Sequence, residues 1–346
     1  MSAGPTVTET YESGQNPQDR PGPLVVIGGA EDKLGRRSVL STFVALAGGR
    51  DARIAVVPTA SSLGPEIVEV YDALFRRLGV ADVVGVRPQT REQAEDPAVV
   101  GLLEDVTGIF MTGGNQLKLS AIVSGTAFGE AILAAHRRGV VVAGTSAGAS
   151  IQSSHMVAFG PGGTTPKQRM TQLAAGLGLV RDTVIDQHFS QRNRYGRLLM
   201  LVAQSPGLLG IGIDEDTAAV VTTGPGPDAG GGPARLLSVV GRGVVTIFDA
   251  RAVVSNAHEA RRTAPLLASG VVLHVLPAGS VFDLGARVLV PSVPVVDPGE
   301  AEELAVAGRD LTRLARDIAA GDVSPSVLRR RRARQAPGVP TEGDQR

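Results

Sequence analysis

The chain has 346 residues, with 34 basic and 34 acidic side chains. Its formal net charge of zero gives no reason to expect nucleic acid or a membrane surface as a partner. There is no cysteine, which excludes disulfides, thiolate metal ligands and a cysteine nucleophile. No stretch has transmembrane length or the layout of a secretory signal, so we expect a cytoplasmic protein.

Residues 1–21 are polar and rich in Gly, Pro, Thr and Gln, which predicts a disordered tail. The apolar runs that follow do not alternate with polar residues, and segments of helical spacing separate them. This pattern indicates a parallel sheet covered on both faces, and therefore a doubly wound α/β architecture. The predicted strands are 24–29, 52–62, 81–86, 107–116 and 140–146, and the predicted helices are 37–49, 66–80 and 128–140.

The pattern changes after about residue 215, where short apolar runs are separated by glycine turns. These runs predict antiparallel strands, and we interpret them as the closing part of one domain over residues 22–298, because no linker precedes them. Residues 299–321 predict an added C-terminal helix. Residues 322–346 predict a disordered basic tail, because the like charges of a four-arginine run repel one another. A role of that tail in binding RNA or other anions is the alternative.

The sequence GTSAG at 144–148 follows a predicted strand and matches the G-x-S-x-G pattern of a nucleophile elbow. Gly144 and Gly148 permit a tight turn that holds Ser146 in a strained backbone conformation. The N–H of Ala147 is then placed to donate to an oxyanion. A plain turn between a strand and a helix fits the same five residues, so the motif alone leaves both interpretations open.

A serine nucleophile needs a base, and the chain has five histidines. His136 and His258 have charged or polar neighbours and His274 lies within an apolar strand, which favours surface or structural roles. His155 follows the elbow helix, where a role as base is poorly explained. His188 lies in VIDQHFSQRNRYGRLL, where an apolar run ends in a polar cluster, and it is the candidate base.

The imidazole in turn needs a carboxylate to orient it. The apolar strand in LGIGIDEDTAAVV ends in Asp214, Glu215 and Asp216, and the spacing does not choose among the three. A solvated acidic turn is the alternative. The order of serine, histidine and acid differs from that of the α/β-hydrolases and agrees with class I glutamine amidotransferase-like folds, although an amidotransferase itself would need a cysteine.

Six motifs, taken in order, resemble the cyanophycinase family of serine peptidases, which is related to peptidase E: GGAEDK, PTAS, FMTGGNQLKL, GTSAGAS, IDQHFSQRNRYGRLL and GIGIDEDTA. The resemblance covers roughly residues 22–292. It implies a three-layer α/β sandwich of the class I glutamine amidotransferase-like type, with a mostly parallel sheet, often dimeric and without metal or cofactor. It also selects Glu215 as the third member of a triad with Ser146 and His188.

The same resemblance implies hydrolysis of cyanophycin, a poly-aspartate chain with an arginine on each β-carboxyl group. The expected products are β-Asp-Arg dipeptides released from chain ends through an acyl-enzyme. An aspartyl dipeptidase of the peptidase E kind, or a related peptidase with another substrate, is the first alternative, because a triad does not set specificity. A non-enzymatic binder of a small ligand on the same fold is the second.

Such a substrate carries carboxylates and a guanidinium group, and the sequence offers partners for both. Arginine forks bind carboxylates, and three arginines closely follow the candidate base. A carboxylate just before the base suits the guanidinium. The predicted substrate contacts are therefore Arg192, Arg194, Arg197 and Asp186, together with the amides of Asn115, Gln116 and Gln187. The backbone N–H groups of Gly113 and Gly114 are predicted to complete the oxyanion hole with Ala147.

Overall fold

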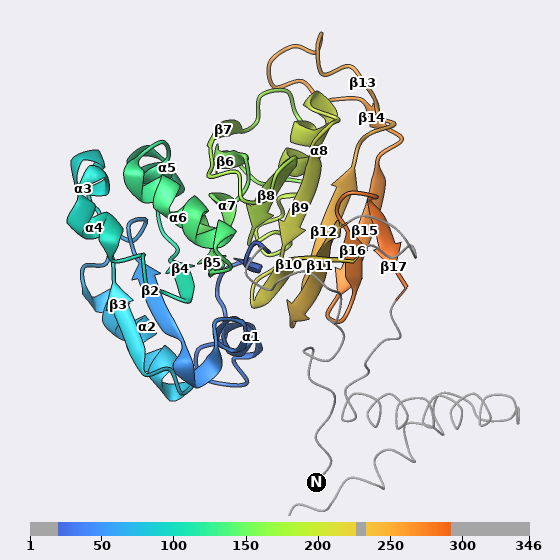
Figure 1. Ribbon diagram of the computed structural model, residues 1–346. Helices are drawn as coiled ribbons and strands as arrows, with labels where there is room; N and C mark the ends of the chain where they lie inside the picture. Colours follow the sequence, from blue (N-terminus) through green and yellow to red (C-terminus); the bar gives the residue numbers. More distant parts are fainter. Residues whose placement is uncertain (1–19, 226–232, 292–346) are drawn as a thin grey trace, which may run out of the picture. The chain divides into compact units, whose positions relative to one another are not determined.

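The computed structural model describes residues 20–225 and 233–291, drawn in colour in Figure 1. These residues belong to one compact unit that ends at Ser292. The N-terminal tail predicted over 1–21 lies outside the described residues except for its last two positions. The predicted helix 299–321 and the predicted basic tail 322–346 lie outside them entirely.

A nine-stranded mixed sheet forms the centre of the α/β fold. Its neighbours pair parallel from β1 to β3 and antiparallel from β1 through β10 to β17. The strands, in spatial order, are β17 (Val288–Val290), β16 (Val281–Asp283), β11 (Pro233–Gly241), β10 (Thr217–Pro225), β1 (Leu24–Ile27), β5 (Val141–Thr145), β4 (Gly108–Met111), β2 (Arg53–Val57) and β3 (Asp82–Gly85).

A second sheet of four strands is the feature that the sequence pattern does not separate from the first. Its order is β15 (Val272–Pro277), β12 (Val244–Asp249), β9 (Leu209–Ile213) and β8 (Thr183–Gln187). Because β8 and β9 pair parallel, their carboxyl ends lie side by side. Two short ribbons, β6 (His155–Phe159) with β7 (Gln172–Ala175) and β13 (Val254–Ser255) with β14 (Ala268–Ser269), complete the strands.

Helices cover both faces of the nine-stranded sheet (Figure 1). They are α1 (Ser38–Leu46), α2 (Glu66–Arg77), α3 (Arg91–Glu95), α4 (Pro97–Gly101), α5 (Gln116–Val123), α6 (Ala127–Arg137), α7 (Ala147–Ser150) and α8 (Tyr195–Gln204), with a short 3₁₀ turn, η2, at Gly49–Asp51. In the described ranges no single helix is long and apolar enough to cross a membrane; α5 and α6 pass that test only together, bent by 91° at their break.

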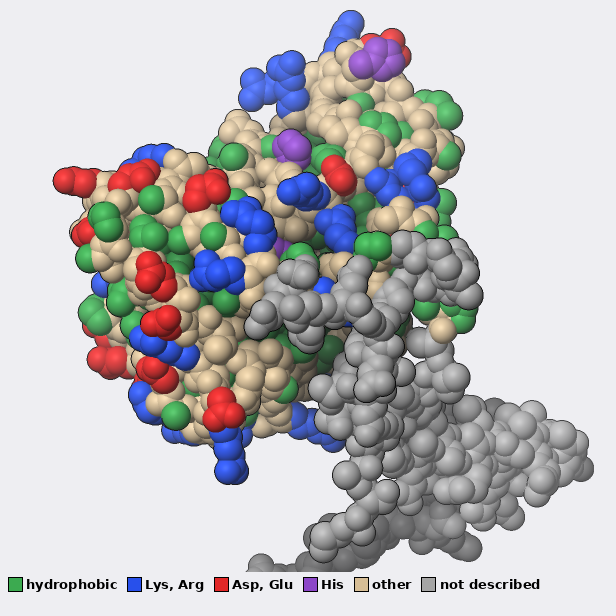
Figure 2. All heavy atoms as spheres, in the orientation of Figure 1, with side chains coloured by type: hydrophobic (Ala, Val, Ile, Leu, Met, Phe, Trp, Pro, Cys, Tyr) green, Lys and Arg blue, Asp and Glu red, His purple; other side chains and the backbone are tan. Residues whose placement is uncertain are grey.

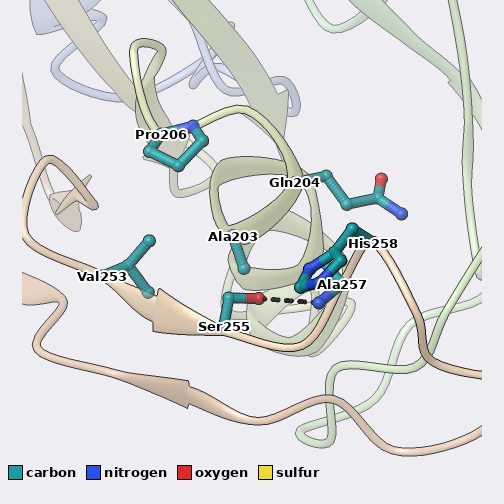
Figure 3. Close-up of a pocket in the computed structure, with 7 residues that line it drawn as sticks. All are labelled: Ala203, Gln204, Pro206, Val253, Ser255, Ala257 and His258. Carbon is teal, nitrogen blue, oxygen red and sulfur yellow. Dashed lines mark hydrogen bonds between the residues drawn. The ribbon is translucent and has the colours of Figure 1, made fainter.

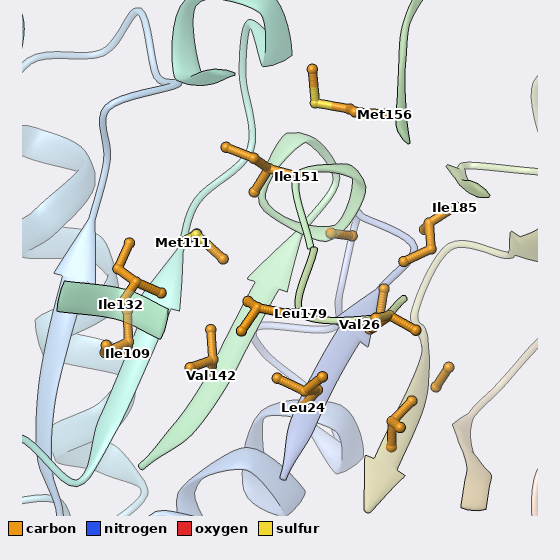
Figure 4. Close-up of a cluster of buried hydrophobic side chains, with 14 of the residues drawn as sticks. Leu24, Val26, Ile109, Met111, Ile132, Val142, Ile151, Met156, Leu179 and Ile185 are labelled. Atoms are coloured by element: carbon orange, nitrogen blue, oxygen red, sulfur yellow. The ribbon is translucent and has the colours of Figure 1, made fainter. Parts of the chain in front are cut away.

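Alternate residues of each parallel strand pack into different cores, which is why these strands are apolar without alternation. Val25 and Ile27 of β1 pack with α1 and α2. Leu24 and Val26 face the other side, where the buried cluster includes residues of α5, α6 and α7 (Figure 4). Ile185 of β8 belongs to this second cluster, so the four-stranded sheet packs against the same side as α7. Helix α8 then covers the opposite face of that sheet.

Candidate active site

The turn from β5 to α7 holds Ser146 in an unusual backbone conformation, with φ 53° and ψ −108°. Non-glycine residues rarely adopt a positive φ, and such strain persists only where the surroundings fix it. A Cβ at Gly144 would lie 2.0 Å from the carbonyl oxygen of Gly148, and one at Gly148 would lie 2.2 Å from that of Met111. Both glycines are therefore required by close backbone approaches, and they hold Ser146 half-buried at the carboxyl end of β5.

The end of β8 places His188 against Ser146. The His188 backbone, also at positive φ, donates its N–H to the Gly28 carbonyl oxygen at 2.8 Å. A Cβ at Gly29 would lie 2.3 Å from the imidazole Cε1, so this glycine makes room for the ring. The imidazole Nε2 lies 3.0 Å from the Ser146 Oγ, within hydrogen-bond distance.

The three acids that end β9 have three different partners in the structure. Glu215 lies at the imidazole, with 2.6 Å between its Oε1 and the His188 Nδ1. Asp214 instead accepts the backbone N–H of Ser190 at 3.0 Å. Asp216 accepts the backbone N–H of Asp32 at 2.7 Å. Since a carboxylate accepts the proton on Nδ1, Nε2 is free to accept the serine hydroxyl proton.

The surroundings of His188 favour a neutral imidazole. Burial lowers the pKa of His188 below its ordinary value of 6.5, although the hydrogen bond to Glu215 opposes this shift. The positive charge of Arg192 lowers the pKa further. A neutral imidazole is the form that can take a proton from serine, so the site keeps a base in its working form at neutral pH.

Three backbone N–H groups lie free near the serine. Within residues 20–225 and 233–291, the N–H groups of Gly113, Gly114 and Ala147 have no hydrogen-bond acceptor. Ala147 is fully buried, where an unpaired N–H is costly unless a ligand satisfies it. A Cβ on Gly113 would lie 3.8 Å from the Ser146 Oγ, whereas one on Gly114 would meet the Ala60 carbonyl. Gly113 and Ala147 are thus the two candidates that flank the nucleophile.

Most of the predicted substrate contacts are instead engaged with one another. Asp186 is fully buried and accepts hydrogen bonds from the guanidinium groups of Arg194 and Arg197. Gln187 accepts from Arg194 and donates to the Gln116 side-chain oxygen at 2.8 Å. Each of these five side chains makes a hydrogen bond within the protein that helps to hold the segment carrying His188, and their contact with substrate stays a prediction.

Arg192 and Asn115 are the two predicted contacts that stay accessible. Both are exposed, and the Arg192 side chain makes no hydrogen bond or ion pair within the described ranges, although its backbone N–H donates to the His188 carbonyl at 3.0 Å. The Asn115 oxygen caps α5 by accepting the Lys118 N–H at 3.0 Å, and its amide nitrogen has no partner among the residues that the structure describes. Figure 2 shows Lys and Arg side chains gathered on the middle of one face, over the region where Figure 1 labels β5 and β10.

A separate open cavity of about 480 Å³ lies beyond the carboxyl end of α8 (Figure 3). Its lining includes Gln204, Ser255 and His258 but none of the predicted site residues. The presence of a cavity therefore does not identify the site here, and the candidate site is defined by the strained serine with its paired histidine. Among the described residues, no group of three or more His, Asp or Glu side chains is arranged to hold a metal ion.

Comparison with known proteins agrees with the peptidase chemistry that the site geometry indicates. The family model for peptidase family S51 matches residues 24–225. The chain belongs to this family. The cyanophycinase of Nostoc sp. (strain PCC 7120) is 40% identical over 281 residues, which cover 81% of this chain and 91% of the relative. That of Geminocystis herdmanii is 37% identical, over 75% of this chain and 93% of the relative. The resemblance stated from the six motifs is thus confirmed.

The fold agrees with that of a solved relative. The crystal structure of a peptidase from an acI-B1 actinobacterium superimposes with a TM-score of 0.54, covering 77% of this chain and 98% of that chain, at 22% identity. At this identity the likeness establishes the fold alone. This S51 peptidase is therefore a serine peptidase on a mixed α/β fold.

Two features of the site could not be placed from the sequence. Gly28 and Gly29 form the surface against which His188 packs, and Gln191 accepts the backbone N–H of Glu215 at 3.0 Å. The sequence does contain a signal for these glycines, because GGAEDK begins at the end of the predicted strand 24–29. The motif does not say which side chain the glycines accommodate, since that partner is more than 150 residues away in sequence.

Proposed function

We propose that this protein is a serine-type exopeptidase that hydrolyses cyanophycin to β-Asp-Arg dipeptides. The observation that carries the proposal is the alignment of Ser146, His188 and Glu215, in a chain that is 40% identical to a cyanophycinase. The alignment supplies a nucleophile, a base and an orienting carboxylate in hydrogen-bond contact. The relative supplies the class of substrate.

In the proposed reaction His188 Nε2 takes the Ser146 hydroxyl proton as Oγ attacks a backbone carbonyl of the aspartate chain. Ala147 and a Gly113 or Gly114 N–H donate to the oxyanion. His188 then returns the proton to the leaving amine, the C–N bond breaks and an acyl-enzyme remains. His188 next deprotonates a water, whose oxygen attacks the acyl carbon. The ester C–O bond then breaks, and His188 returns the proton to the Ser146 Oγ. Glu215 holds the ring and stabilises its protonated form throughout.

Substrate recognition in this proposal falls to the exposed groups. Arg192 lies close enough to affect His188 electrostatically, and its free guanidinium suits a carboxylate of the β-Asp-Arg unit. The amide nitrogen of Asn115, next to the oxyanion candidates, suits a carbonyl of the chain. The buried network around Asp186 acts on the substrate indirectly, because it fixes the segment from which both His188 and Arg192 project.

Three further parts of the proposal concern the molecule as a whole. We assign the fold to the class I glutamine amidotransferase-like type, supported by a triad order of serine, histidine and glutamate. We also propose one peptidase domain over residues 22–298, and a homodimer that works in the cytoplasm. Sedimentation velocity of the full chain tests the dimer, and a monomer at micromolar concentration contradicts it.

A product assay tests the function directly. The full chain is incubated with cyanophycin and, in a separate reaction, with α-aspartyl dipeptides, and the products are identified by mass. The proposal predicts β-Asp-Arg accumulating from the start of the cyanophycin reaction, as release from chain ends requires, and no turnover of the α-dipeptides. Cleavage of the α-dipeptides alone would support an aspartyl dipeptidase instead. Long fragments from cyanophycin at early times would contradict exopeptidase action.

A further inference from the structure

The loop over residues 28–33, GGAEDK, contacts all three segments of the proposed triad. The Gly28 carbonyl accepts the N–H of His188 at 2.8 Å, and the Gly29 carbonyl accepts that of Asp216 at 2.9 Å. The Glu31 carboxylate accepts the hydroxyl of Thr145 at 2.6 Å. Thr145 and Asp216 directly adjoin the nucleophile and the proposed acid in sequence. The proposed mechanism uses no side chain of this loop.

Glu31 is a buried carboxylate whose two oxygens bind in different directions. Its side chain is 1% exposed. Oε1 accepts from the Tyr71 hydroxyl at 2.6 Å and from the Lys33 ammonium at 2.8 Å, while Oε2 accepts from Thr145. Burial by itself raises the pKa of a carboxyl, but the charge of Lys33 and the donated hydrogen bonds outweigh it, so the pKa of Glu31 is lowered. Glu31 is therefore a fully partnered buried anion.

We propose that Glu31 is a positioning residue for the nucleophile: its carboxylate ties Thr145, and with it the strained turn at Ser146, to the loop on which His188 rests. Oε1 accepts from both Tyr71 and Lys33, so the ion pair with Lys33 still anchors the carboxylate when the Tyr71 bond is lost, and Oε2 presents a fixed acceptor to the end of β5. The inference rests on the proposed role of Ser146 as nucleophile and does not depend on which peptide is cleaved.

The physical need for such an anchor lies in the geometry of the turn. Ser146 has a backbone conformation that its own side chain disfavours, so the neighbouring contacts must hold it. The 3.0 Å distance between its Oγ and the His188 Nε2 depends on two strand ends from different sheets. The loop over 28–33 is bonded to both strand ends, through Thr145 on one side and His188 on the other.

A pair of substitutions separates positioning from simple stability. Thr145→Val removes the hydroxyl that donates to Oε2 of Glu31, on the side of the nucleophile. Tyr71→Phe removes the hydroxyl that donates to Oε1 of the same carboxylate, and both hydrogen bonds are 2.6 Å long. The readout is the rate at which diisopropyl fluorophosphate modifies Ser146, where an O–P bond forms, fluoride leaves and His188 takes the serine proton. We expect a ~10- to 100-fold slower rate for Thr145→Val, the size that small misplacements of reacting groups cause.

Thr145→Ser keeps the hydroxyl and is expected to recover most of the lost rate. Tyr71→Phe is expected to lower the melting temperature while keeping the labelling rate within about threefold of wild type, since the bond to Thr145 remains. With a peptide substrate, Thr145→Val should lower kcat and leave KM nearly unchanged, because no substrate contact is lost. The pH at which kcat/KM of Thr145→Val falls on the acid side (the acid limb of the pH profile) should match wild type. The reason is that Glu215, Arg192 and Arg194 are the charged groups that shift the pKa of His188.

Equal rate losses in Thr145→Val and Tyr71→Phe would show a purely structural carboxylate and overturn the inference. A moved acid limb in Thr145→Val would show that the base is displaced and would overturn it as well. If wild-type Ser146 is not labelled, both this inference and the proposed nucleophile fail. If labelling follows the prediction while cyanophycin is not cleaved, the positioning role stands and the proposed substrate fails.

Discussion

The nucleophile side and the base side of the site are held by different kinds of interaction. Besides the side-chain bond between Glu31 and Thr145, the turn at Ser146 is held by backbone approaches so close that Gly144 and Gly148 have no space for a side chain. The segment after β8 is held by side chains, with Asp186 between Arg194 and Arg197. Glycine spacing is a local property of the sequence, whereas a buried ionic network depends on the folded surroundings. The two sides should therefore respond differently to substitution.

The largest effect is expected on the nucleophile side. Ser146→Ala removes the attacking oxygen and should lower kcat by ~10³-fold or more without changing the melting temperature, since the loss is chemical. Steady-state kinetics and a thermal melt provide the two readouts. Ser150→Ala is the matched control from the short helix that follows Ser146: its buried hydroxyl has no hydrogen-bond partner among the described residues, so its removal should leave kcat unchanged. A fall in kcat for Ser150→Ala similar to that of Ser146→Ala would show that the loss is not specific to the proposed nucleophile.

The base side should respond mainly in stability. Arg197→Met leaves the fully buried Asp186 with one cationic partner in place of two, and breaking a buried pair typically costs about 3–5 kcal/mol in the free energy of unfolding. Urea denaturation measures that change. Arg76→Met is the control, because it removes an exposed ion pair with Asp72, and its urea midpoint should hardly move. Similar midpoints for the two variants would mean that the network does not hold the segment.

The smallest expected effect is a shift in pH dependence. Activity requires neutral His188, so kcat/KM should fall as the pH drops through the pKa of His188, which burial places below 6.5. Arg192→Met removes a positive charge that lowers this pKa, so the acid limb should move to higher pH. Arg192→Lys keeps the charge and should keep the limb in place. A limb that moves to lower pH in Arg192→Met would contradict the charge assignment.

The difference between the two sides also explains what the sequence could predict. The elbow is predictable because G-x-S-x-G after an apolar run reflects a local steric rule. The parallel strands are predictable because burial on both faces removes alternation, as in β1 and β5. The acid could not be chosen from spacing, because Asp214, Glu215 and Asp216 differ only in which distant group each one meets.

The arginines after the base show the same limit of prediction from the sequence. A run with Arg192, Arg194 and Arg197 gives three equivalent charges in sequence, so the sequence predicts the same role, substrate contact, for all three. The structure turns Arg194 and Arg197 inward to Asp186 and leaves Arg192 exposed. That distinction depends on where α8 begins and on the second sheet beneath it, neither of which the local pattern specifies.

The most direct test of the account asks which atom of the wild-type chain is the nucleophile. The full chain is treated with increasing amounts of diisopropyl fluorophosphate, digested and mapped by mass spectrometry, while cyanophycin hydrolysis is followed in the same samples. The account predicts one adduct, on Ser146, and a loss of hydrolysis in proportion to its occupancy. Full hydrolysis with Ser146 occupied, or inactivation with the adduct on another residue, would contradict it.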